Sequence, residues 1–536
     1  MRPPWCRRPA CDRTNLAGGT PALHFNLLAS AILVGVWALL YLPHLRTSPS
    51  WYGDEGLALT AGLNLIRGVP AHGSFWNTFW NAYAPYQPAY ELLIGWASAL
   101  TGNDILGGRF INTLLALATA FAICFGGRKI MGPILALGSA LLFLTYEQSV
   151  IHFRWIFTHN LIALGFAIAF PALCGKRTLR ADLTAGFGLA LGALALPLAI
   201  YGFLAAGLLV IRRPRSWLPV VGPYVAVTLA SLATALILFP GTGFLFSDLR
   251  ATAEFYSDAT RENSGGWGVF ANLFRFFTQD GFHAIAFLMM LVCLRGKTFA
   301  LGFGGLVISV LLLQNRQNLT LFYYQAIILT PLLALAIGAG LQKLLRLLHK
   351  SNSRLRWPRL AIRFAPIFAS AVFFLAILPS SLSGKLTPRI AYWTTQSIPE
   401  VESAAAWINS KTTPDDLVLC HQNIAWQLHA HTADFLQATT WLGLETWPFK
   451  TPLRSDQFRF APDPALARFA IIADIDSRWT FAQPNVSRLL KRFENEKWPI
   501  VWSGENYFIL ENPAMSPRAE QMLDLKKRAG QRLDFM

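Results

Sequence analysis

Two adjacent carboxylates, Asp54 and Glu55, lie in the motif WYGDEG (residues 51–56), shortly after the first long apolar run of the chain. A carboxylate at a membrane surface can act as a general base or bind a metal ion. The same residues could instead cap the helix that we expect to follow, because the N-terminus of a helix favours acidic side chains. The local pattern therefore predicts either a catalytic acid pair or a helix cap.

Further ionisable side chains lie near the predicted ends of apolar segments, where such residues are candidates for function. The guanidinium group of arginine matches the oxygens of a phosphate, although an arginine at such a place can also anchor a helix end. The candidate phosphate-binding residues are Arg109, Arg154 and Arg316. The candidate substrate contacts are Glu91, His152, His159 and Tyr324.

The composition identifies the class of protein. The chain has 536 residues, of which 54% are hydrophobic and only 14% charged, whereas soluble proteins carry about 25% charged residues. The net charge of +17 lies entirely in residues 1–379, because the 17 basic and 17 acidic residues of 380–536 cancel. Positive charge between apolar segments marks cytoplasmic loops. These observations exclude a soluble enzyme and argue against nucleic-acid binding.

The apolar runs predict a polytopic α-helical membrane protein with about 11 spans. A span needs about 20 residues. The 183–211 run is too long for one span and rich in Gly and Pro, so we expect two short helices there, whereas 86–102 is expected on the outer surface. The runs are 24–42, 105–125, 131–145, 157–173, 183–211, 217–239, 282–294, 298–313, 320–342 and 361–379.

This topology predicts the domain organisation. Residues 1–23 form a cytoplasmic basic leader, and 24–379 form the membrane module, with long outer loops at 44–104 and 240–281. Residues 380–536 have a soluble composition and predict an extracytoplasmic α/β domain, with strands near 416–420, 469–475 and 507–511 and helices at 401–409 and 486–496. The N-terminus is expected inside and the C-terminus outside a bacterial inner membrane.

The C-terminal domain also contains residue types that bind zinc, namely Cys420, His421, His429, His431 and Asp434. Their spacing matches no closed four-ligand pattern. We therefore expect structural or surface roles and assign no metal ligands. No cofactor is required by this interpretation, and a divalent metal is left open.

An ordered set of motifs resembles the GT-C fold, that is, the polytopic glycosyltransferases that use lipid-phosphate sugars. It is most similar to family 39, with protein O-mannosyltransferases and lipid A aminoarabinose transferases. The resemblance covers about residues 24–345. The matching segments are Gly53 to Gly56, the helix ending at Arg67-Gly68, Tyr86 to Gly102, Gly108 to Asn112, Gly126 to Lys129, Arg154, and Tyr323/Tyr324 with Pro331.

The resemblance implies that a sugar moves from a polyprenyl-phosphate donor to an acceptor hydroxyl with inversion, on the outer face of the membrane. Asp54 matches the family's general base, and Glu55 is its neighbour or substitute. Arg154 and Arg316 would stabilise the departing phosphate, and Arg109 could do so or be structural. Gln87-Pro88-Ala89 and Thr158-His159-Asn160 depart from the family pattern, which leaves the donor sugar and the acceptor open.

Two other functions remain as alternatives. A transporter or flippase would show repeated halves with broken helices near the membrane midplane, and no such symmetry is visible in the sequence. A non-catalytic membrane scaffold with a partner-binding outer domain would tolerate Asn in place of Asp54.

Overall fold

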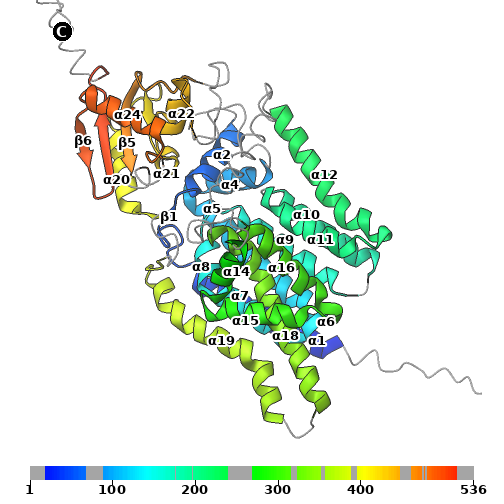
Figure 1. Ribbon diagram of the computed structural model, residues 1–536. Coiled ribbons are helices and arrows are strands. Elements are labelled where there is room, and N and C mark those ends of the chain that lie inside the picture. The colour runs from blue at the N-terminus through cyan, green and yellow to red at the C-terminus, as the bar shows by residue number, and fades with distance from the viewer. Residues whose placement is uncertain are drawn as a thin grey trace, which may run out of the picture.

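The computed structural model describes residues 19–67, 88–175, 177–195, 197–238, 268–314, 323–351, 356–387, 395–446, 460–473, 476 and 480–515. Long helices make up one part of the molecule, and a mixed sheet with its helices forms the opposite end (Figure 1). The helices α2 and α4 lie between these two parts. The two outer loops are therefore described only in part.

Six helical segments are long and apolar enough to cross a membrane, and a bent pair could add a seventh. These segments lie in α1 (Gly19–Tyr41), in α5 (Ile105–Phe121) continued through a π-helical turn (Ala122–Gly126) into α6 (Gly127–Met131), and in α12 (Pro214–Leu238), α16 (Phe299–Leu313), α18 (Thr330–Ser351) and α19 (Arg356–Leu382). The pair is α14 (Gly268–Thr278) and α15 (Gly281–Cys293), bent by 116°. The chain is thus a polytopic helical membrane protein.

The expected count of about 11 spans is not confirmed, because several apolar runs form short helices. These are α7 (Pro133–Thr145), α9 (His159–Leu173), α10 (Leu179–Ala193) and α11 (Ile200–Val210). A helix of 15 residues is only about 22 Å long, against a hydrocarbon core of about 30 Å. Nearly every residue of α7 and α9 is buried against other helices. The prediction of two helices within 183–211 is confirmed by α10 and α11.

Two short helices, α2 (Glu55–Arg67) and α4 (Pro88–Leu100), pack closely beside the long helices. Their backbones meet at two glycines: a Cβ on Gly62 would lie 2.2 Å from the Glu91 carbonyl oxygen, and one on Gly95 would lie 2.3 Å from that of Gly62. Neither helix is long enough to count as a candidate span. This agrees with the expectation that 86–102 does not cross the membrane.

The C-terminal region contains a five-stranded sheet in the order β4-β3-β5-β7-β6. Strands β3 (Leu417–Leu419), β4 (His431–Ala433) and β5 (Ala467–Ala473) are parallel, whereas β6 (Ile500–Ser503) and β7 (Tyr507–Glu511) pair antiparallel. The accompanying helices are α20 (Ile398–Asn409), α21 (Gln422–Ala425), α22 (Phe435–Trp441) and α24 (Pro484–Asn495). All three expected strands and both expected helices are present, and β4, β6, α21 and α22 were not predicted.

A second, two-stranded sheet joins the two parts of the chain. Strand β1 (Trp51–Tyr52) pairs antiparallel with β2 (Thr395–Gln396), so that Trp51 lies opposite Gln396. The residues just before Asp54 are therefore held by the segment that leads into the C-terminal sheet.

Candidate active site

Asp54 lies at the N-terminus of α2. Its backbone carbonyl accepts hydrogen bonds from the amides of Leu57 at 3.1 Å and Ala58 at 3.4 Å, which is the position of a helix cap. Its half-buried side chain accepts a bond from Nε2 of Gln422, at 3.3 Å from Oδ1. The backbone thus fits the cap hypothesis, while the carboxylate faces a residue of the C-terminal domain and stands where the helix dipole favours a negative charge.

Glu55 faces away from solvent and forms a bidentate ion pair with Arg109 of α5. Nε of Arg109 lies 2.9 Å from Oε1, and Nη2 lies 2.7 Å from Oε2. Oε1 also accepts the backbone amide of Ile156 at 2.9 Å. The Glu55 and Arg109 side chains are 1% and 0% exposed. Glu55 therefore forms a structural contact, whereas the resemblance implied a second acid beside Asp54 that could substitute for it as the base.

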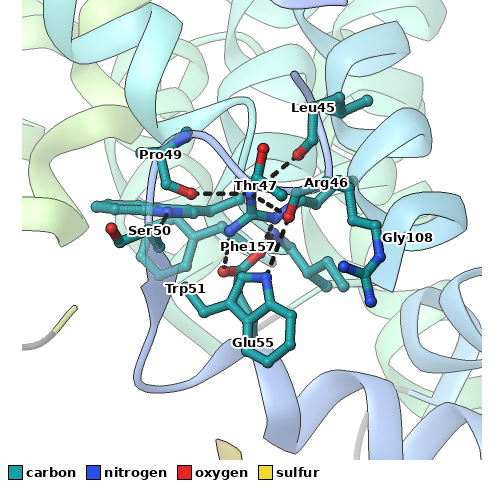
Figure 2. A network of polar contacts seen from close by, with 12 residues as sticks. Leu45, Arg46, Thr47, Pro49, Ser50, Trp51, Glu55, Gly108 and Phe157 are labelled. Carbon is teal, nitrogen blue, oxygen red and sulfur yellow. Dashed lines mark hydrogen bonds and ion pairs between the residues drawn. The ribbon is translucent and has the colours of Figure 1, made fainter. Parts of the chain in front are cut away.

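The remaining donors of Arg109 hold the loop that leads to Asp54. Its Nη1 donates to the carbonyl oxygens of Leu45 at 3.0 Å and Pro49 at 2.9 Å. Figure 2 shows these two carbonyls directed at the centre of the network, beside Glu55. Because the guanidinium group already contacts a carboxylate and several carbonyls, Arg109 is placed as a support for the loop, the structural alternative considered for it.

Arg154 has a similar environment. Its Nη1 donates to the carbonyl of Leu40 and to Oγ of Ser381, both at 3.1 Å, and Nη2 donates to the carbonyl of Pro43. Its side chain is fully buried. These bonds tie the end of α1 to the end of α19, whereas the expected role was to bind a lipid phosphate.

A buried polar network between α4, α5 and α9 was not predicted. Oδ1 of Asn112 accepts bonds from the Tyr90 hydroxyl and from Nδ2 of Asn160, both at 2.9 Å. Nearby, the indole of Trp155 donates to the carbonyl of Ser50 at 2.9 Å. The sequence signal that could have predicted this network is the presence of asparagines within apolar runs, because polar residues in such segments must find partners. This network fixes residues 153–158 against the Glu55–Arg109 pair.

The expected substrate contacts are mostly buried. Glu91 is 6% exposed, and its Oε2 has no hydrogen-bond partner among the described residues. Burial raises the pKa of Glu91 well above its usual value. His152 is hydrogen-bonded through Nδ1 to the carbonyl of Gln148 at 2.8 Å, and the ring of His159 stacks on Phe157 with centroids 4.3 Å apart.

Arg316 and residues 240–267 of the long loop 240–281 lie outside the described residues, and so does the side chain of Tyr324. Within the described parts of the chain, no group of three or more His, Cys, Asp or Glu side chains could hold a metal ion. The Cys420 thiol is buried, and burial raises its pKa well above the usual value.

No protein-family model and no curated protein sequence matches the chain. The chain does resemble ArnT from Cupriavidus metallidurans solved with undecaprenyl phosphate, with a TM-score of 0.55 and 14% identity over 92% of this chain and 99% of ArnT. The same ArnT in the apo state gives a TM-score of 0.54. The oligosaccharyltransferase of Archaeoglobus fulgidus, solved with zinc and sulfate, gives 0.52 at 11% identity over 90% of this chain and 73% of that one.

The chain has the GT-C fold. The likeness covers both the helices and the C-terminal sheet, since it extends over nine-tenths of the chain. At 14% identity it establishes the architecture and not the residues of the site. Within this GT-C fold, Asp54 is the half-buried acid next to the ion pair of Glu55 and Arg109.

Proposed function

We propose that the protein is a membrane glycosyltransferase that moves a sugar from a polyprenyl phosphate to an acceptor hydroxyl. The observation that carries this proposal is the likeness, over 92% of the chain, to ArnT solved with undecaprenyl phosphate. The position of Asp54 supports it, because this carboxylate lies at a helix N-terminus beside the membrane helices and is not part of the buried ion pair.

In the proposed reaction Asp54 is the general base. It takes the proton of the acceptor hydroxyl as the acceptor oxygen attacks the anomeric carbon of the sugar. The bond between that carbon and the phosphate oxygen breaks, and its electron pair leaves with the polyprenyl phosphate. Attack from the face opposite the leaving group inverts the anomeric configuration. General-base assistance of this kind typically contributes about 10²- to 10⁴-fold to the rate.

The negative charge that collects on the departing phosphate requires a cationic partner. Both Nη groups of Arg109 and of Arg154 already bind carboxylate, carbonyl or hydroxyl oxygens, and both side chains are fully buried. We therefore retain Arg316 as the candidate phosphate ligand and assign the other two arginines to support the site. The basic clusters between the apolar segments favour an active site on the extracytoplasmic side, in a bacterial inner membrane.

The test is replacement of Asp54 by Asn, which removes the base with little change of shape. Wild type and variant would be purified in detergent and incubated with a panel of polyprenyl-phosphate-linked hexoses and pentoses, with cell-envelope extract as acceptor. Release of free polyprenyl phosphate is measured by mass spectrometry. We expect Asp54→Asn to lower the rate at least 10²-fold while thermal unfolding is unchanged.

The matched control is Asp463→Asn. Asp463 is also half-buried, and its Oδ1 accepts the backbone amide of Ala465 at 2.9 Å, a contact that an Asn side chain can keep. This variant should keep full activity. Wild-type activity of Asp54→Asn would contradict the assignment of the base. The absence of any release by the wild type, combined with transport of a polyprenyl phosphate in vesicles, would favour a flippase.

A further inference from the structure

The segment that follows β3 in the C-terminal domain lies directly on the loop that carries Asp54. Nε2 of Gln422, the first residue of α21, donates to Oδ1 of Asp54 at 3.3 Å and to the carbonyl of Gly53 at 3.2 Å. These two acceptors are adjacent in the chain, so one amide group holds both the backbone and the carboxylate of the candidate base. Hydrogen bonds at a catalytic site are often long before substrate binds.

Backbone packing sets this contact. A Cβ on Gly56 would lie 2.2 Å from the carbonyl oxygen of Gln422 and 2.8 Å from Cα of Asn423. Distances below 3.0 Å to backbone atoms cannot be relieved by turning a side chain. Glycine at position 56 is therefore what allows α21 to lie against the first turn of α2.

Contacts on either side fix the same docking arrangement. The rings of Trp51 and Trp426 lie 5.4 Å apart. Strands β1 and β2 pair through Trp51 and Gln396, and Arg46 forms an ion pair with Glu402. Because these contacts surround the Asp54 loop, the position of Gln422 is set by the whole docked domain and not by one mobile side chain.

Gln422 also lies at a position of the sheet where α/β folds commonly place ligand-binding residues. Strands β4, β3 and β5 are parallel, and the chain goes from β3 to β4 on one side and then returns to β5 on the other. Loops at the carboxyl ends of such strands are where α/β sheets usually present functional groups. Gln422 comes three residues after the end of β3.

We propose that Gln422 is a positioning residue for Asp54, so that the active site is complete only when the C-terminal domain is docked on the first outer loop. The inference rests on the proposed function. The Gln422 amide donates to Oδ1 of Asp54 and thereby fixes the orientation of the carboxylate that is to receive the proton of the acceptor hydroxyl. A neutral donor bound to a carboxylate also favours its charged form, which is the form that a base requires.

The first test is Gln422→Leu, which keeps the approximate volume and removes the donor. We expect kcat to fall roughly 10- to 100-fold, as for loss of a hydrogen bond to a charged group, with little change in KM for the lipid donor. The acidic limb of the pH–rate profile should move to higher pH, because the ionised carboxylate has lost a donor. Gln427→Leu is the matched control, since Gln427 is a partly buried glutamine of the same segment whose Nε2 has no hydrogen-bond partner among the described residues.

The second test does not alter Gln422. Gly56→Ala should force α21 away from α2 and reproduce the loss of kcat and the shift of the acidic limb. Gly35→Ala is its control, because a Cβ there meets nothing within 4 Å. Thermal unfolding of every variant, and proteolysis of the segment between α19 and α20, show whether a variant is folded and docked.

The outcomes separate the two proposals. If Asp54→Asn is inactive while folded Gln422→Leu and a Gly56→Ala protein with its C-terminal domain displaced both match the wild type, Gln422 has no positioning role and only this inference fails. If Gln422→Leu loses activity without a shift of the acidic limb of the pH–rate profile, Gln422 serves only domain packing. This result would also overturn the inference. If Asp54→Asn is active, the proposed function itself fails.

Discussion

At the scale of single residues, the two adjacent acids have different environments. Glu55 is 0% exposed and bound to Arg109, whereas Asp54 is half-buried and meets the C-terminal domain. Successive side chains at the start of α2 point in different directions, which explains the difference. The Glu55 side chain enters the packing between helices, and the Asp54 side chain does not. A buried ion pair gains little over an apolar pair of similar volume, but loss of one partner leaves an uncompensated charge.

This argument predicts the behaviour of a double-mutant cycle. Arg109→Met should lower the free energy of unfolding by about 3–5 kcal/mol, since it leaves the Glu55 carboxylate buried without a counter-ion. Glu55→Gln combined with Arg109→Met should be more stable than Arg109→Met alone. The measurement is thermal or denaturant unfolding of the four proteins in detergent. Independent, additive effects of the two substitutions would show that the pair is not coupled in the folded protein.

At the scale of helices and strands, much of the local structure could be predicted from the sequence. The glycine- and proline-rich interruption separates α10 from α11, and short runs of apolar residues locate β5 and β7. Strand β4 has the sequence HTA and contains no apolar run, whereas the equally short β3 has the apolar sequence LVL. The count of about 11 spans is not confirmed, because α7 and α9 are short helices that are buried against other helices. Apolar content alone does not show whether such a helix crosses the membrane.

The site was less predictable than the elements. Asp54 and Arg109 could be recognised as candidates by type and position, but their partners could not. The Glu55–Arg109 pair joins residues 54 positions apart, and the Asp54–Gln422 contact spans 368 positions. No local pattern encodes such distances, since they depend on how α5 and the C-terminal sheet dock on the first outer loop. Gln422 in particular follows a short strand without any motif that would single it out.

The carboxyl edge of the C-terminal sheet provides a prediction about pH. Asp476 is 1% exposed, and its Oδ2 accepts the amide of Ala473 at 3.0 Å. Burial raises the pKa of Asp476 to about 7. An acid whose pKa is higher in the folded than in the unfolded protein binds more protons when folded, so its contribution to stability decreases as pH rises from about 4 to 7.

Hydrogen exchange can test this sign in the full-length protein. After correction for intrinsic exchange rates, the protection of the β5 amides in the wild type should decrease between pH 5 and pH 8. In Asp476→Asn the decrease should be smaller. The substitution keeps an acceptor for the Ala473 amide and removes the titration. An equal dependence of protection on pH in both proteins would show that Asp476 is already ionised at pH 5.

At the scale of the whole molecule, charge and fold together predict an orientation. The excess of +17 lies in residues 1–379, in clusters such as Arg212, Arg213 and Arg215 at the turn between α11 and α12. Basic loops stay on the cytoplasmic side. The C-terminal sheet lies at the opposite end of the molecule from the C-terminal half of α18 and the first turns of α19 (Figure 1), which carry Lys343, Arg346, Arg359 and Arg363. The sheet and the adjoining Asp54 loop are therefore expected outside.

Cysteine labelling in intact cells tests this orientation. Cys124, Cys174, Cys293 and Cys420 are buried, so replacing Cys6 and Cys11 by Ser leaves a background with little reactivity. In that background, Glu505→Cys at the exposed turn between β6 and β7 should react with a membrane-impermeant maleimide from outside. Arg212→Cys, also exposed, should react only after permeabilisation. The reverse pattern would place Asp54 on the cytoplasmic side, where a donor presented from the outer leaflet could not reach it.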